Sequence, residues 1–478
     1  MRGFPDSGAF RKRRPALPRQ RLRSGCAPRT RNCQMTAPHA HLVGVAGVGM
    51  NPLAQALLAC GWQVSGSDRY LDSGQDVEVL PKLRRAGVRL VPQDGSGVTP
   101  NTAAVVASTA IESDNADLAA AARLGVPVVH RSAMLARLCE GKELIAVTGT
   151  SGKTTVTGMV GFLLEQLSDD PTVVNGGVVV NWESDTAIGN VRVGRSSRWV
   201  IEADESDRSC LNFHPDWAIL TNLSADHFSL EETRALFAAF LSKVKKGVVG
   251  IEGEPAPWRR MHPELSASGS RFGYGGQAFH VPLLGMHNAE NALQAIVLCE
   301  RLGHPLDRIA AALVKFRGIR RRLDIAGTAA GVTVIDDYAH NPAKIRAAWQ
   351  AVAPYYARVI AAWRPHGFGP LAKMYDDLKA LFTEMGKRSE RLYILPVYYA
   401  GGTATGTVTS DALAADLARE GVPVELAADA DDLVRRVAAL ARPGDVVLSM
   451  GARDPGLPAT ARRIVEAIAS ERGGSQAE

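Results

Sequence analysis

The sequence predicts an α/β protein assembled from strand–helix units, with enough chain for about three domains. Short apolar runs rich in β-branched residues alternate with helical patterns from about residue 41 to the C-terminal region. Glycines or acidic residues follow many of these runs directly, as is usual where parallel strands end at a ligand crevice. The chain has 478 residues, and domains of about 100–200 residues are typical.

The composition is that of a globular protein, with 46% hydrophobic and 22% charged residues. No apolar run approaches the roughly 20 residues that cross a bilayer, so we expect no membrane insertion. The six cysteines form no C-x-x-C pair, and Cys60, Cys139 and Cys299 lie in helical apolar patterns that predict buried thiols. This usage favours a reducing cytoplasm over a disulfide framework or a zinc site.

The net charge of +6 comes from the N-terminal end of the chain. Residues 1–34 contain ten Lys or Arg and one acid, a balance of +9, which leaves −3 for the remainder. We therefore predict a disordered basic tail over residues 1–40. A nucleic-acid arm or a targeting peptide is one interpretation of the tail, and translation from Met35 is the other. We favour the second, because the tail has no foldable pattern, and we expect no nucleic-acid partner.

The clearest motif is a phosphate loop between an apolar run at residues 144–147 and a helical pattern from Val156. Its glycines let backbone N–H groups approach phosphate oxygens, and the helix N-terminus adds a favourable dipole. The first glycine lies two residues later than the general pattern requires, so an ordinary strand-to-helix turn is the alternative. We predict a nucleoside-triphosphate site formed by Gly149, Thr150, Ser151, Gly152, Lys153, Thr154 and Thr155, with the lysine on the β- and γ-phosphates and the first threonine on Mg²⁺.

A second glycine turn follows the first predicted strand, within residues 42–49. Its glycines resemble a dinucleotide fingerprint with shifted spacing, and an acid that can hold ribose hydroxyls ends the next strand about 20 residues later. The pattern predicts a bound nucleotide diphosphate without saying which nucleotide, and a tight turn with no ligand is the alternative. The candidate residues are Gly44, Gly47, Gly49 and Asp68.

Two further predicted strands end in polar clusters. Glu202 follows the strand at 199–201, and His227 follows the strand at 218–223. Because both strand ends should face one crevice, we expect these residues to lie near the phosphate loop. Glu202 is well suited to Mg²⁺, whereas His227 is softer and could equally be a general base or an orienting residue. A solvated acidic loop is the alternative, but two such clusters after a phosphate loop favour a site.

Three later segments carry candidate polar residues. Residues 285–291 precede an apolar helix predicted over 292–302, and their amides suit helix capping and a purine edge equally well. The arginines at 320–322 form either a solvated face or a source of positive charge for a transferring phosphate. The strand at 332–335 ends in two aspartates, and a later strand ends in the loop 364–370, which should face a crevice as well.

Together these motifs resemble the Mur ligase family, from about Leu42 to Ile468. Five segments carry the resemblance in the family's order, and the shortened phosphate loop is similar to the family's own form. The segments are the glycine turn with 61–68, then 148–155, 202–207, 285–291 and 336–342. The resemblance implies three α/β domains: a Rossmann-like UDP-substrate domain over 41–140, a P-loop ATPase-type domain over 141–317 and a Rossmann-like amino-acid-binding domain over 318–478.

The resemblance also implies the activity and the site. It implies an ADP-forming, ATP- and Mg²⁺-dependent ligase of peptidoglycan precursor synthesis that joins L-alanine to UDP-N-acetylmuramate through an acyl phosphate. A recycling ligase that adds a preformed peptide and a degenerate nucleotide-binding regulator are the alternatives. The implied roles are the β- and γ-phosphates for Lys153, one Mg²⁺ for Thr154, a second Mg²⁺ for Glu202 and His227, adenine for His287, Asn288 and Asn291, phosphates for Arg322, and the ribose side of ATP for Asp337 and His340.

The sequence departs from the alanine-adding members of the family at four places. The loop 364–370 lacks the arginines that follow Pro-His in those enzymes. Ser151 and Asn341 each stand where a histidine is usual, and the middle domain is shorter between Gly250 and Gly285. These departures bear on the identity of the amino acid rather than on the use of ATP.

Overall fold

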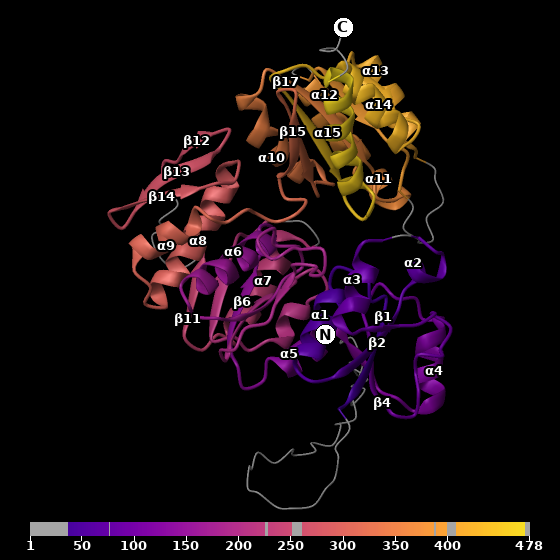
Figure 1. Cartoon of the computed structure of the whole chain (residues 1–478), viewed down its shortest axis with the longest axis vertical. Helices are drawn as coiled ribbons and strands as arrows, with labels where there is room; N and C mark the ends of the chain where they lie inside the picture. The colour runs from indigo at the N-terminus through magenta and orange to yellow at the C-terminus, as the bar shows by residue number, and fades with distance from the viewer. Residues whose placement is uncertain are drawn as a thin grey trace, which may run out of the picture. The chain divides into compact units, whose positions relative to one another are not determined.

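The computed structural model describes residues 37–75, 77–224, 228–250, 261–386, 389–398 and 408–473 (Figure 1). Residues 38–478 form one compact unit that contains three large sheets and one small one. Residues 1–36 of the tail predicted over 1–40, and the candidate His227, lie outside the described residues. Within the described ranges, no helix combines the length and the apolar character needed to cross a membrane.

The first sheet is fully parallel, with the order β3-β2-β1-β4-β5. The strand order reverses direction at β1, so the turn after β1 lies at the switch point where α/β sheets bind ligands. One face packs on α1, α3 and α5 and the other on α4. The elements are β1 (His39–Val43), α1 (Met50–Ala59), β2 (Gln63–Ser67), α2 (Arg69–Asp72), α3 (Val79–Ala86), β3 (Arg89–Leu90), β4 (Thr102–Ala107), α4 (Ala116–Leu124), β5 (Val128–His130) and α5 (Arg131–Leu138).

The second sheet has the order β11-β10-β6-β9-β7-β8 and is parallel except for the edge strand β8. β6 lies at its centre, so the phosphate loop emerges between the ends of β9 and β10. The elements are β6 (Glu143–Thr148), α6 (Lys153–Gln166), β7 (Thr172–Val174), β8 (Val191–Arg192), β9 (Arg198–Glu202), the 3-10 helix η1 (Ser209–Asn212), β10 (Trp217–Leu220), α7 (Leu230–Leu241) and β11 (Gly247–Gly250).

The helix that carries the 285–291 motif packs beside α6 (Figure 1). A small antiparallel sheet of three strands precedes it and packs on the helix that follows. These elements are β12 (Glu264–Ser266), β13 (Gly269–Tyr274), β14 (Gln277–Val281), α8 (Met286–Arg301) and α9 (Leu306–Leu313). The helix begins at Met286, so the prediction that the motif precedes a helix at 292–302 is wrong, and the motif forms the first turns of α8.

The third sheet has the order β15-β16-β20-β17-β18-β19, with only the edge strand β15 antiparallel. Alternate strand residues face opposite sides: Ala361 packs on α10, α12 and α13, and Ile360 packs on α14 and α15. The elements are β15 (Asp324–Ala329), β16 (Val332–Asp337), α10 (Pro342–Val352), η3 (Ala353–Tyr355), β17 (Arg358–Arg364), α11 (Phe368–Lys373), α12 (Tyr375–Gly386), β18 (Arg391–Ile394), α13 (Ser410–Arg419), β19 (Val424–Leu426), α14 (Ala430–Leu440), β20 (Asp445–Gly451) and α15 (Leu457–Gly473).

The first two large sheets share a hydrophobic core. Leu53 of α1 belongs to the same buried cluster as Ile201 of β9 and Phe240 of α7. Burial of apolar surface stabilises this contact at about 25 cal/mol per Å², so the turn after β1 is held firmly against the second sheet. Two sequence predictions need correction, one on a boundary and one on the burial of a cysteine. β1 begins at His39, inside the range assigned to the tail, and Cys60 is exposed because it caps the C-terminal end of α1.

Candidate active site

The phosphate loop runs from the end of β6 to the first residue of α6. Gly149 and Gly152 adopt φ of +133° and +84°, a region that favours glycine. A Cβ at Gly149 would lie 2.1 Å from Oγ1 of Thr221, and one at Gly152 would lie 2.5 Å from Oδ1 of Asn291. The loop is therefore packed between the end of β10 and the start of α8, which explains why it needs glycine at both positions.

Residues at the end of β10 hold the loop in place. Asn222 accepts hydrogen bonds from the backbone N–H of Ser151 (3.0 Å, at Oδ1) and of Thr150 (3.1 Å, at its carbonyl oxygen). The hydroxyl of Thr221 donates to the carbonyl oxygen of Ser151 at 2.6 Å. Thr221 and Asn222 directly follow β10, and sequence reasoning missed both as residues that support the loop. Their position at the end of a predicted strand, after a phosphate loop, was a usable signal.

Lys153 is buried against carboxylates at the start of α6. Its Nζ lies 2.6 Å from Oε2 of Glu205 and 3.9 Å from Oδ1 of Asp204, and it donates to the carbonyl oxygen of Gly149 at 2.9 Å. Burial alone would lower the pKa of Lys153, but the nearby carboxylates, Glu205 foremost, raise it overall. The lysine is thus a cation at neutral pH, and its ammonium group is held by two carboxylates and a backbone carbonyl oxygen. Glu205 and Asp204 were not among the predicted site residues.

Thr154 and Glu202 form a pair of hard oxygen ligands beside the loop. The hydroxyl of Thr154 donates to Oε1 of Glu202 at 2.9 Å, and the backbone N–H of Gly176 donates to Oε2 at 2.8 Å. A hydroxyl and a carboxylate at this spacing fit Mg²⁺, which is usually held by one or two protein oxygens together with phosphates and water. No cluster of three or more His, Cys, Asp and Glu side chains suited to a metal occurs among the described residues.

The motif on α8 faces the phosphate loop through its asparagines. Asn291 lies against Gly152, and its Nδ2 donates to Oδ1 of Asn288 at 3.3 Å. Nδ2 of Asn288 donates to the carbonyl oxygen of Leu284 at 2.8 Å. The N-cap residue of α8 is Gly285, and no side chain makes a capping hydrogen bond there. The capping interpretation of this motif is therefore wrong. Burial lowers the pKa of His287 to about 4, so that its ring is neutral at neutral pH.

On the third sheet, Asp337 ends β16 and His340 lies three residues further along. Asp337 accepts hydrogen bonds at 2.7 Å from the backbone N–H groups of Leu323 and Ala339, and burial raises its pKa. Nδ1 of His340 donates to the carbonyl oxygen of Tyr338 at 3.0 Å. The His340 ring also lies edge-on to that of His366, with centroids 4.8 Å apart.

The arginine cluster 320–322 is not a solvated face. Arg320 pairs with Glu183 at 2.6 Å, and Nη2 of Arg321 donates to the carbonyl oxygen of Gly451 at 2.6 Å. The guanidinium of Arg322 lies over the ring of Tyr338, 5.1 Å from its centroid. Each arginine therefore has a distinct contact. Arg322 forms no ion pair with the described residues, but its positive charge opposes the rise in the pKa of Asp337.

The turn after β1 brings Gly44, Gly47, Gly49 and Asp68 together. Oδ2 of Asp68 accepts from the backbone N–H of Ala46 at 2.8 Å, and Oδ1 accepts from that of Tyr70 at 3.0 Å, which caps α2. Each carboxylate oxygen keeps a lone pair for a further donor such as a ribose hydroxyl.

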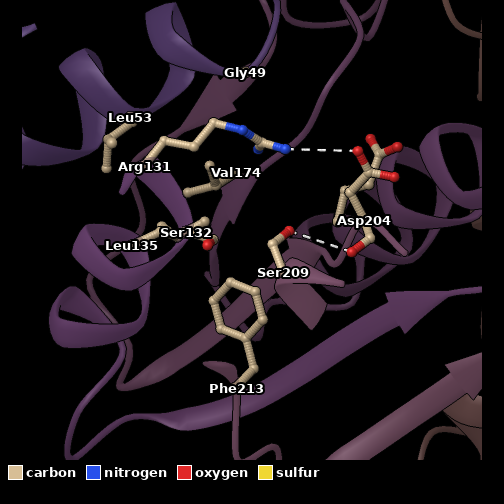
Figure 2. Close-up of a pocket in the computed structure, with 10 residues that line it drawn as sticks. Gly49, Leu53, Arg131, Ser132, Leu135, Val174, Asp204, Ser209 and Phe213 are labelled. Atoms are coloured by element: carbon tan, nitrogen blue, oxygen red, sulfur yellow. Dashed lines mark hydrogen bonds and ion pairs between the residues drawn. The ribbon is translucent and has the colours of Figure 1, made fainter. Parts of the chain in front are cut away.

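A small pocket connects this turn to the second sheet, and Figure 2 shows its lining residues. Arg131, the first residue of α5, extends past Gly49 toward Asp204. A Cβ on Gly49 would lie 3.1 Å from Nη1 of Arg131, and Nη2 lies 3.5 Å from Oδ2 of Asp204 and 3.4 Å from Oδ2 of Asp207. Glu202 lines the same pocket. Sequence reasoning missed Arg131, because nothing local marks it apart from its place after a strand.

Family models match all three parts of the chain. The family models for the Mur ligase catalytic domain, middle domain and glutamate ligase domain match residues 39–143, 147–246 and 321–453. The chain belongs to the Mur ligase family.

Named relatives narrow the comparison. The chain is 33% identical to the UDP-N-acetylmuramate–L-alanine ligase of Methylocella silvestris over 87% of this chain and 96% of the relative. It is 32% identical to the ligase of the same name from Myxococcus xanthus over 87% and 93%. The crystal structure of the UDP-N-acetylmuramate–alanine ligase of Thermotoga maritima matches with a TM-score of 0.74 and 26% identity, over 91% of this chain and 99% of that one. A murein peptide ligase from Psychrobacter arcticus shares the fold, with a TM-score of 0.62 and 22% identity.

Proposed function

We propose that this chain joins L-alanine to UDP-N-acetylmuramate in an ATP-dependent, ADP-forming reaction that proceeds through an acyl phosphate. The observation that carries the proposal is the meeting of Lys153, Thr154 and Glu202 at one end of the second sheet, next to the pocket of Arg131 and Gly49. Relatives that share about a third of their residues with the chain over most of its length carry the name of this activity.

The residues present divide the work of the reaction. The N–H groups of Thr150 and Ser151 already donate to Asn222, so the N–H groups at the start of α6 and Lys153 hold the β- and γ-phosphates, once the lysine exchanges Glu205 for phosphate oxygens. Magnesium held by Thr154 and Glu202 would supply Lewis-acid stabilisation of the transferring phosphoryl group. The turn after β1, with Gly44, Gly47, Gly49 and Asp68, holds the UDP part of the substrate (Arg131 lies at the inner end of this turn).

The chemistry takes two steps. A carboxylate oxygen of the UDP substrate attacks the γ-phosphorus, the bond to ADP breaks, and an acyl phosphate forms. The amine of L-alanine then attacks the carbonyl carbon, and the tetrahedral intermediate loses phosphate and a proton to give the amide. The two anions, carboxylate and γ-phosphate, can approach each other only where cations offset their charge. Lys153 and Arg131 supply positive charge here, and magnesium held by Thr154 and Glu202 would add to it.

The remaining residues complete the ATP site in this proposal. His287, Asn288 and Asn291 on α8 contact adenine, and Arg322 contacts the phosphates. Asp337 and His340 lie on the ribose side. The three domains are those of residues 41–140, 141–317 and 318–478, and we place the enzyme in the cytoplasm.

A phosphate-release assay tests the function. Purified protein is given ATP, Mg²⁺ and UDP-N-acetylmuramate, with a panel of single amino acids and the preformed tripeptide. The proposal expects release that depends on both the UDP substrate and L-alanine. Release with the tripeptide but not with L-alanine would support a recycling ligase instead, and absence of release with every amine would support a regulator. Lys153→Ala serves as the inactive control.

A further inference from the structure

The three central strands of the third sheet end side by side. Asp337 of β16 is the register partner of Met450 on β20, and Gly451 of β20 is the partner of Arg364 on β17. The segments that follow, 338–340, 452–454 and 365–367, therefore share one edge of the sheet. In open α/β sheets this carboxyl edge is where ligands bind.

The carboxylates at this edge already have partners. Oδ2 of Asp454 accepts from Nη1 of Arg364 at 2.6 Å, and its Oδ1 accepts from the backbone N–H of Gly456 at 2.8 Å. Asp337 accepts two backbone N–H groups, and Asp336 lies 3.4 Å from Nε of Arg321. No acid of β16, β20 or the loops after them is left to neutralise another cation within the described ranges.

Arg453 is the exposed cation in the middle of this edge. It lies two residues beyond the end of the central strand β20, and its guanidinium has no ion pair or hydrogen bond with the described part of the chain. Its neighbours Ala452 and Asp454 are buried, and the N–H of Asp454 donates to the carbonyl oxygen of Ala452 at 2.7 Å. The chain thus fixes the backbone on both sides of Arg453 and leaves its side chain free to meet a ligand.

The backbone of Arg453 is strained. Its φ is +61°, in the left-handed region that glycine adopts freely and that an arginine adopts only against a steric penalty. Such strain persists at functional sites, where the surrounding structure holds it. A glycine would relieve it, yet the position carries the longest cationic side chain.

The neighbouring loop offers no substitute cation. After Arg364, which is tied to Asp454, the loop continues with His366, Gly367 and Phe368. The pKa of His366 is lowered to about 4 by burial and by the positive charge of Arg453 and Lys344, so the ring is neutral and lies within the field of the arginine. Positive charge for an anion at this part of the edge therefore comes from Arg453, with Lys344 and Arg322 of the neighbouring segments as further cations.

We propose that Arg453 binds the carboxylate of the incoming amino acid, at the sheet edge that also carries His340 and His366. This inference rests on the proposed function. A free amino acid carries its own carboxylate, and that group must be held while the amine reacts; a guanidinium holds a carboxylate with two parallel hydrogen bonds. ATP phosphates present the same anionic chemistry, but the phosphate loop lies on the second sheet, with Lys153 as its own cation.

The test compares Arg453→Gly and Arg453→Lys with wild type in the phosphate-release assay, with L-alanine and L-alaninamide as amines. We expect the glycine variant to raise KM for L-alanine by about tenfold or more, to leave KM for ATP within about twofold, and to lose most of the preference for alanine over its amide. The lysine variant, which keeps one charge, should be intermediate. Ala330→Gly is the matched control, because Ala330 also has positive φ (+47°) but lies in the turn between β15 and β16.

A second measurement, thermal unfolding, separates binding from structure. Relief of left-handed strain should leave the Tm of both glycine variants equal to or above that of wild type. An unchanged preference for alanine over alaninamide in Arg453→Gly would overturn the inference, as would a rise in KM for ATP alone or a clear fall in Tm. If wild type itself released no phosphate with L-alanine, the proposed function would fail, and this inference with it.

Discussion

Replacing Lys153 by Met should lower the stability of the protein, because buried carboxylates surround the lysine. The side chain of Glu205 is only 4% exposed, and its nearest cation, Nζ of Lys153, is 2.6 Å away. Removing one partner of a buried ion pair typically destabilises a protein by about 3–5 kcal/mol, because the other charge is left without compensation. Protonation of Glu205 removes its charge and so reduces this destabilisation.

The protonation of Glu205 makes the stability of Lys153→Met depend on pH. Burial raises the pKa of Glu205 to about 7 although Lys153 lowers it, so loss of the lysine raises the pKa further. A carboxyl group whose pKa is higher in the folded state than in the unfolded state is stabilising below the unfolded pKa of about 4.5. That stability is lost at about 1.4 kcal/mol per pH unit as the pH rises toward the folded pKa, which is about 7 in wild type and higher in the variant. The stability difference between Lys153→Met and wild type should therefore stay constant below pH 7 and widen by up to about 1.4 kcal/mol per unit above pH 7.

The assay is thermal unfolding of four proteins at pH 6, 7, 8 and 9: wild type, Lys153→Met, Glu205→Gln and the double variant. We expect the double variant to recover most of the Tm lost by Lys153→Met at pH 9, while both variants that lack the lysine stay inactive. Glu205→Gln alone should unfold close to wild type, because the lysine keeps Asp204 and the carbonyl oxygen of Gly149. A double variant no more stable than Lys153→Met, or a Tm difference that does not widen above pH 7, would refute the reasoning.

Three further predictions address the loop, the metal pair and the third sheet. Thr154→Val keeps the shape of the side chain but removes its hydroxyl, so the Mg²⁺ concentration for half-maximal activity should rise by about tenfold, and a titration that shows no shift would exclude Thr154 as a ligand. Gly152→Ala combines a left-handed backbone (φ +84°) with overlap against α8, and should cost about 2 kcal/mol and weaken ATP binding. Its control is Gly61→Ala, which has φ +82° and open space around it; equal losses in both would disprove the packing argument. Burial lowers the pKa of His340 to about 3, so the unfolded state binds more protons between pH 6.5 and 3, and stability should fall as the pH drops through that window. His340→Asn should reduce the slope of Tm against pH there, and an unchanged slope would contradict the burial of this ring.

The sequence could predict the features that depend on a short continuous stretch. Strand, glycine loop and helix follow one another in the phosphate loop, so its glycines and Lys153 were recognisable without tertiary structure. Glu202 was predicted correctly as a partner of the loop region, since parallel strands place their carboxyl ends at one edge. The same rule drew attention to the two aspartates at the end of β16.

The features that sequence reasoning missed arise from contacts between distant segments. Arg131 starts a helix of the first sheet but contacts a loop of the second, and Glu205 was lost among several acids of which only one was chosen. The start of α8 was placed too late because asparagine and glycine are typical of caps, whereas here packing against the phosphate loop keeps Asn288 and Asn291 inside the helix. Local preference was overridden by tertiary contact in each case.

The most direct test of the account follows one oxygen atom. UDP-N-acetylmuramate labelled with ¹⁸O in its carboxylate is turned over with ATP and L-alanine, and the released phosphate is analysed by mass spectrometry. An acyl phosphate transfers one carboxylate oxygen to the phosphate, so we predict a single ¹⁸O in each phosphate released. Unlabelled phosphate would mean that water, not the substrate carboxylate, attacks ATP, and would contradict the proposed ligase chemistry.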